Sequence, residues 1–141
     1  MDAFANLYAR HPLVFFHMIA AVSALLVGAF QLWRAGRGDT GHRVWGWLWV
    51  LLMAIATVTS AFVRDYRMPN IAGFTPIHFF TLYVAIQLPL AVYNAKTGNI
   101  IAHKARMKGL FIGGCVIAGV FTLLPGRFLG QQLWHNLLGV V

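Results

Sequence analysis

Four apolar runs of bilayer-spanning length follow one another along this chain, and they constrain its fold more than any other feature. They cover residues 13–33, 44–62, 76–93 and 100–124. A transmembrane helix needs about 20 predominantly apolar residues, and an α-helix satisfies its own backbone hydrogen bonds in lipid. The runs therefore predict an all-α integral membrane protein that folds as an antiparallel four-helix transmembrane bundle.

The composition argues against a nucleic-acid-binding protein in spite of a strong positive charge. Of the 141 residues 60% are hydrophobic, and only three are acidic, whereas the formal net charge is +8. The basic residues are concentrated between the apolar runs, where they carry information on membrane topology. We therefore expect a lipid bilayer around this chain and no nucleic-acid partner.

The basic residues are unevenly divided between the two sides of the predicted bundle. One side holds Arg34, Arg37, Arg43, Lys96, Lys104, Arg106 and Lys108; the other holds Arg10, Arg64, Arg67 and Arg127. The positive-inside rule places the richer side in the cytoplasm and both termini outside. The first run lacks a small-residue cleavage pattern, so it predicts a retained helix rather than a signal peptide.

Turn and cap residues separate the later runs. Thr75 followed by Pro76 is typical of an N-cap with proline at the first helical position. Gly98 followed by Asn99 predicts a helix end and a new N-cap. Pro89 lies inside the third run, where a kink is expected.

Segments outside the four runs predict short interfacial helices at both ends of the chain. In the tail 126–141, polar and leucine residues recur on separate faces at helical spacing, as in a helix that lies in the headgroup plane. Phe4, Leu7 and Tyr8 suggest the same for the first residues, and Trp45, Trp47 and Trp49 suggest an aromatic belt. No linker divides the chain, so residues 1–141 are expected to form a single bundle.

Four histidines lie at the ends of the apolar runs and pair by membrane side. His17 and His78 belong to the predicted outer side, and His42 and His103 to the cytoplasmic side. In an up-and-down bundle the first and third helices are diagonal, as are the second and fourth. Each pair could then approach one central group, although each histidine taken singly is as well explained by headgroup contacts or core packing.

Small residues follow His17 along one helical face, at Ala21, Ala24 and Gly28. They predict a slot wide enough for a flat macrocycle beside the imidazole. The alternative is that small residues let helices pack closely, as in many membrane bundles.

The number of ligands per level favours haem over a bare metal ion. Each level offers two histidines and at most one methionine, whereas zinc or copper usually takes three or four protein ligands. Haem needs only two axial ligands, and haem c is excluded because no Cys-x-x-Cys-His string is present. We therefore expect one or two haem b groups, with His17, His78, His42 and His103 as iron ligands. Arg43, Lys104, Arg106 and Lys108 would neutralise the propionates or attract an anionic donor.

Three short strings, with the histidine of the first run, resemble a bacterial family of predicted four-helix membrane proteins of unassigned function. The strings are Gly41-His42-Arg43-x-x-Gly46, Pro76-Ile77-His78-Phe79-Phe80 and His103-Lys104-x-x-Met107. The resemblance covers nearly the whole chain and implies a multi-pass protein of the bacterial inner membrane. More distantly, the paired histidines on diagonal helices are similar to the di-haem cytochrome b membrane proteins.

The likeness to di-haem cytochrome b proteins implies electron transfer with a quinone or another small redox partner. If the chain is an enzyme, it is expected to be a membrane oxidoreductase. Two alternatives remain open: a non-catalytic accessory subunit of a larger membrane complex, and a metal-binding membrane protein. A homodimer is a further expected form of assembly.

Overall fold

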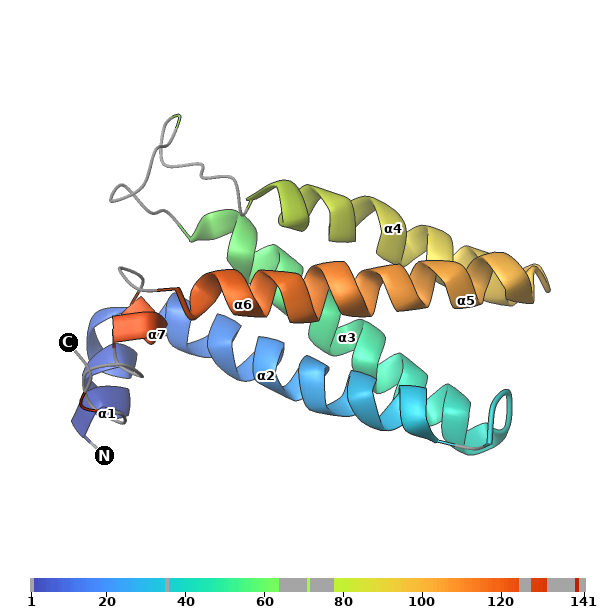
Figure 1. The fold of residues 1–141 in the computed structure, drawn as a ribbon, viewed down its shortest axis with the longest axis horizontal. Helices are drawn as coiled ribbons and strands as arrows, with labels where there is room; N and C mark the ends of the chain where they lie inside the picture. The colour runs from blue at the N-terminus through green and yellow to red at the C-terminus, as the bar shows by residue number, and fades with distance from the viewer. Residues whose placement is uncertain are drawn as a thin grey trace.

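Helices make up nearly all of the described chain in the computed structural model. The structure describes residues 2–34, 36–63, 71, 78–124, 128–131 and 139. The helices are α1 (Asp2–Arg10), α2 (Pro12–Trp33), α3 (Thr40–Phe62), α4 (His78–Lys96), α5 (Ile100–Gly109), η1 (Leu110–Ile117), α6 (Ala118–Thr122) and α7 (Phe128–Gln131). Between α5 and α6 the helix continues in the wider π geometry as η1, so these three elements form one rod (Figure 1).

Three of the described helical stretches are long and apolar enough to cross a membrane. They are α2, α3 and the rod from Ile100 to Thr122. This confirms an all-helical protein of the membrane class. The third predicted run corresponds to α4, which falls outside this set because its 19 residues include polar positions such as Gln87 and Asn94.

The long helices form a closed ring of contacts. α2 packs on α3, α3 on α4, α4 on α5 and η1, and η1 returns to α2. Figure 1 shows each long helix running back alongside the one before it, with α1 beside the start of α2. In this ring α2 lies across from α4, and α3 lies across from the rod.

A side-chain cap extends α3 beyond the apolar run that predicts it. The Asp39 carboxylate accepts a hydrogen bond from the His42 backbone N–H at 2.7 Å and pairs with Arg34 at 2.8 Å. The helix therefore begins at Thr40 instead of residue 44, and His42 lies in its first turn. This correction arises because an N-cap satisfies backbone donors that hydropathy does not register.

The boundary predicted between the third and fourth runs is confirmed. Gly98 has a left-handed φ of +79°, which glycine adopts without a steric penalty. The Asn99 side chain accepts from the Ala102 backbone N–H at 3.2 Å and caps α5. The predicted cap at Thr75 and Pro76 lies outside the described residues, as does most of the tail 126–141.

The predicted slot along α2 is filled by aromatic side chains in the described structure. A Cβ added at Gly28 would lie 2.6 Å from Trp49 Nε1 and 2.7 Å from the Phe111 ring. Trp49 is buried and donates from Nε1 to the Ala24 carbonyl at 2.9 Å. Close helix packing therefore explains Ala24 and Gly28, and the assignment of Trp49 to an aromatic belt is wrong.

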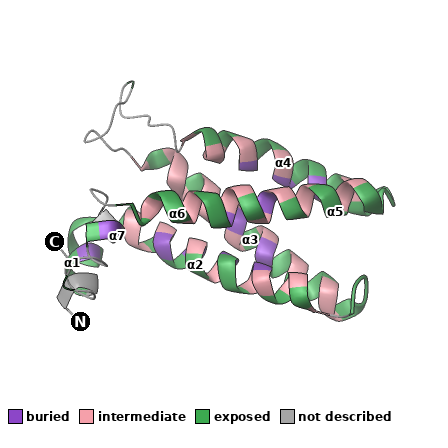
Figure 2. Ribbon diagram, in the orientation of Figure 1, coloured by how far each residue is buried: buried purple, intermediate pink, exposed green. Residues whose placement is uncertain are grey.

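Burial follows the inside of the bundle, whereas its outer surface is largely exposed and apolar (Figure 2). The core combines residues from all four long helices: Ala24, Trp49, Met53, Val84, Leu88, Ala91, Leu110 and Cys115. This core lies midway along the bundle and separates its two ends. Because apolar side chains cover the outside as well, the helices are suited to a lipid environment.

Candidate functional site

The four histidines lie at two opposite ends of the bundle. We call the end where α2 begins and α3 finishes the His17 end, and the end where α3 and α5 begin the His103 end (Figure 1). His17 and His78 belong to the first, and His42 and His103 to the second. All four side chains are half-buried.

His17 docks on the C-terminal part of α3. Its Nδ1 lies 3.0 Å from the Ala56 carbonyl oxygen and 3.0 Å from Thr59 Oγ1. A carbonyl oxygen only accepts hydrogen bonds, so Nδ1 carries the proton, and in the neutral imidazole Nε2 keeps the lone pair. This is the orientation that protein scaffolds give to metal-ligating histidines, whose second nitrogen donates to a carbonyl or carboxylate.

His78 begins α4 and contacts the same end of α3. Its Nε2 lies 3.0 Å from the carbonyl oxygen of Val63, the residue that ends α3. Val63 is one turn beyond Thr59, so the structure brings His17 and His78 to neighbouring positions on α3. The carbonyl contact assigns the proton of a neutral His78 ring to Nε2.

His42 takes part in a contact between α2 and α3 at the His103 end. The side-chain amide of Gln31 donates to the His42 carbonyl at 2.9 Å and lies 3.3 Å from His42 Nδ1. Since an amide nitrogen only donates, His42 Nδ1 accepts and Nε2 carries the proton.

His103 joins α5 to α4. Its Nδ1 lies 2.9 Å from the Ala91 carbonyl oxygen. By the same reasoning as for His17, Nδ1 carries the proton and Nε2 keeps the lone pair. Each end of the bundle therefore holds one histidine whose Nε2 is oriented as in a metal ligand.

The His103 end also contains polar groups that the histidine pattern does not predict. Arg106 Nη1 donates to Gln87 Oε1 across α5 and α4. Three side-chain atoms are buried without a hydrogen-bond partner in the described structure: Gln31 Oε1, Asn94 Nδ2 and Arg106 Nε. Orphaned buried polar atoms call for a water, ion or ligand that completes them.

The sequence signal for this polar group is the presence of glutamines within apolar runs. Gln31 lies near the end of the first run and Gln87 in the middle of the third. Of the basic residues expected near haem propionates, Arg43 and Lys104 are exposed. Arg106 instead turns toward the neighbouring helix.

The carboxylate of Asp39, which caps α3, is stabilised in its ionised form by its hydrogen-bond donors. The hydrogen bond from the His42 backbone N–H, followed by the hydrogen bond from Arg34, holds the pKa of Asp39 below its ordinary value. Asp39 therefore stays charged at neutral pH and fixes the loop that leads into His42.

The described residues contain no group of three or more His, Cys, Asp or Glu side chains that could hold a metal ion. This gives no support to a bare zinc or copper site within that part of the chain. A haem iron takes two axial nitrogens, and at each end one described histidine, His17 or His103, keeps a lone pair on Nε2. His42 and His78 would have to exchange their present hydrogen bonds to offer Nε2.

The fold and the polar bundle ends together define an all-helical integral membrane protein. Within that class the chain belongs to the family described as predicted membrane protein (DUF2306), whose model matches residues 14–125. No curated protein and no solved structure matches the chain. The family match confirms the predicted relation to a membrane family of unknown function.

Proposed function

We propose that this chain is a four-span membrane protein that binds haem b through paired histidines and transfers electrons. One observation carries the proposal. At each end of the bundle one histidine, His17 or His103, donates Nδ1–H to a carbonyl of the neighbouring helix. That hydrogen bond fixes the tautomer in which Nε2 can bind iron.

The outer surface of α4 supports its role as the fourth span. Leu82, Ile86 and Leu90 recur every four residues along one face and are 59%, 51% and 39% exposed. Together with α4's contacts to α3 and η1, this places an apolar face outside and a packed face inside. Such a two-sided helix belongs in lipid within an antiparallel bundle.

In this proposal His78 is the second ligand beside His17, and His42 the second beside His103. In support, His17 and His78 contact neighbouring turns of α3, and His42 and His103 both lie in the first turns of their helices at the His103 end. The bound haem would supply one-electron redox chemistry. The chain's own residues orient the imidazoles and keep water from the bundle interior.

The basic side chains at the His103 end complete the proposed site. Arg43 and Lys104 are exposed beside the histidine-bearing turns, where they can meet propionates at the membrane surface. By the positive-inside rule this end would face the cytoplasm, and the membrane of this proposal is a bacterial inner membrane. A quinone or another small redox partner would then exchange electrons with the haem.

The absorbance spectrum of the full chain, expressed with sufficient haem and purified in detergent, tests the proposal. We expect a Soret band that shifts on reduction, and a loss of roughly half or more of the haem in His17→Ala and in His103→Ala. His11→Ala is the matched control, because His11 is exposed and its side chain makes no cap hydrogen bond. Absence of the band, or equal haem in all three variants, would overturn the proposal.

A further inference from the structure

An apolar groove runs between α3 and α4 on the outer surface near the His103 end. It has a volume of about 380 Å³ and is lined by Val50, Leu88, Pro89, Val92, Tyr93 and Lys96. Leu88, Val92 and Lys96 succeed one another every four residues, so they form one row along α4. The groove is therefore an open, elongated apolar depression with a cation at one end.

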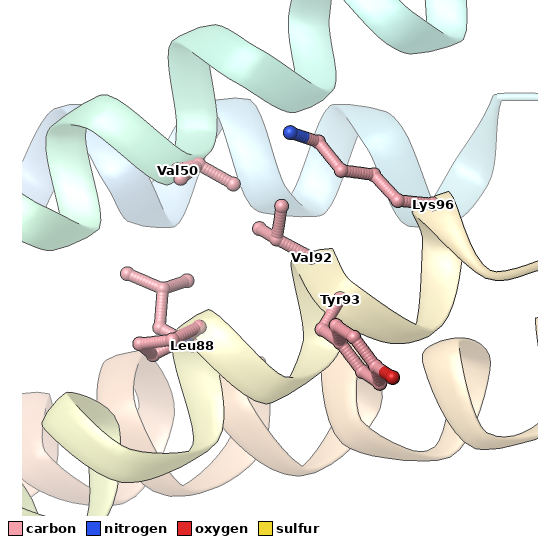
Figure 3. A pocket seen from close by; sticks show the side chains of 6 residues that line it. Val50, Leu88, Val92, Tyr93 and Lys96 are labelled. Atoms are coloured by element: carbon pink, nitrogen blue, oxygen red, sulfur yellow. The ribbon is translucent and has the colours of Figure 1, made fainter.

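Lys96 is the charged residue of this groove. In Figure 3 its amine extends over Val92 toward Val50 of α3, whereas the Tyr93 hydroxyl points the other way. Lys96 Nζ lies 5.7 Å from the centre of the exposed Trp47 ring on α3. The ammonium group is thus held over the groove at the end of α4, and the described ion pairs leave it without a carboxylate.

We propose that this groove binds one acyl chain of an anionic phospholipid, with a phosphate oxygen of its headgroup on Lys96. The apolar row of α4 contacts the acyl chain, and the Lys96 ammonium group pairs with the negatively charged phosphate. An exposed tryptophan beside the lysine is typical of headgroup depth in a membrane. The proposal does not depend on haem, since it uses none of the histidines.

Charge complementarity selects this occupant. Only three acidic residues are present in the whole chain against eleven basic ones, so a second copy of the chain would bring mainly repulsive charge to Lys96. A zwitterionic lipid also carries a phosphate, but its own quaternary ammonium offsets that charge, so it attracts Lys96 less strongly than an anionic lipid does. An anionic lipid satisfies both the apolar lining and the cation, and the basic loops of the same end attract it electrostatically.

Lipid retention by the full chain in native mass spectrometry tests this site. The purified protein is titrated with phosphatidylglycerol and, separately, with phosphatidylcholine of the same acyl chains. For Lys96→Gln we expect about a fivefold weaker first binding step for phosphatidylglycerol, the loss of one lysine's attraction. Phosphatidylcholine binding should stay as in the unmodified chain.

Three further variants make the result specific. Lys96→Arg should restore phosphatidylglycerol binding because it restores the charge. Val92→Trp should weaken both lipids because it fills the groove, and its helicity is checked by circular dichroism; Val92→Phe replaces it if the helix content falls. Lys108→Gln is the control, an exposed lysine of α5 outside the groove. Equal losses in Lys96→Gln and Lys108→Gln, or no loss in the groove-filling variant, would overturn the proposal.

Discussion

The two ends of the bundle carry equivalent pairs of histidines in very different surroundings. At the His17 end the imidazoles contact α3 through two carbonyls and one hydroxyl. At the His103 end, His42 contacts Gln31 and His103 contacts the Ala91 carbonyl. Three described side-chain atoms, on Gln31, Asn94 and Arg106, are buried without a hydrogen-bond partner. Among the described residues, the buried side-chain atoms without a hydrogen-bond partner all belong to the second end. The histidines at the two ends of the bundle thus have different polar surroundings.

The packed middle of the bundle is what keeps these ends apart, and disturbing it should have the largest effect. In Gly28→Val the new side chain would clash with Trp49 and Phe111. We expect a loss of roughly 2–3 kcal/mol in the free energy of unfolding, as for an overpacked core. Denaturant unfolding in detergent, followed by circular dichroism, measures it.

Gly119→Ala is the control for this change. An added Cβ at Gly119 meets no atom within 4 Å, so its unfolding free energy should stay the same or rise slightly. If both glycine variants lost the same stability, the close contact at Gly28 would not be the cause.

The difference between the ends can be measured by removing one hydrogen-bond partner from each. Gln87→Leu leaves the Arg106 guanidinium without its described acceptor, and we expect a loss of roughly 2 kcal/mol, as for bonds to charged groups. Thr59→Val removes a neutral contact of His17, which keeps the Ala56 carbonyl. Its expected cost is about 0.5–1 kcal/mol.

The double variant Gln87→Leu, Arg106→Leu separates a lost bond from a stranded charge. If the cost of Gln87→Leu comes from the unpaired guanidinium, removing Arg106 as well should recover most of the stability. A strictly additive double variant, or a larger cost for Thr59→Val than for Gln87→Leu, would contradict the proposed contrast.

The smallest effect on stability is expected in the loop that leads into α3, because substitutions there affect only the His103 end. The pKa of Asp39 is lowered in the folded state, so folding favours the charged carboxylate. Its stabilising contribution is therefore present above its ordinary pKa of about 4 and is lost as pH falls through the lower folded value. Thermal unfolding between pH 3 and 7 should show this loss.

Two substitutions at this position separate charge from capping. Asp39→Asn keeps a good N-cap but not the charge, so it should flatten the pH dependence with a modest loss of stability. Asp39→Ala should lose the cap as well. An unchanged pH profile in Asp39→Asn would show that another carboxylate governs this range.

Hydropathy and cap residues in the sequence predict the helical membrane class and the boundary at Gly98 and Asn99. They do not predict that Asp39 advances the start of α3, because a single side-chain hydrogen bond sets that start. They also predict that Trp49 lies in an interfacial aromatic belt, whereas its side chain is buried in the core. Which tryptophan turns inward depends on the gap that Ala24 and Gly28 offer on α2, and that gap exists only once the helices are packed.

The histidine pattern predicts the two levels at which these residues lie, but not their hydrogen bonds. The choice between Nδ1 and Nε2 depends on which carbonyl of a neighbouring helix lies within reach. For His103 that partner is Ala91, a residue without any polar side chain. Backbone acceptors of this kind leave no trace in the sequence.

The π-helical segment η1 gives the rod a property that a regular helix would lack. Successive residues of an α-helix turn by about 100°, and a wider stretch of eight residues changes the angular relation between the segments on either side. The direction in which α5 presents His103 and Arg106 therefore differs from the direction that a regular helix would give it relative to α6. One continuous helix can thus act as two differently oriented halves, each matched to its own end of the bundle.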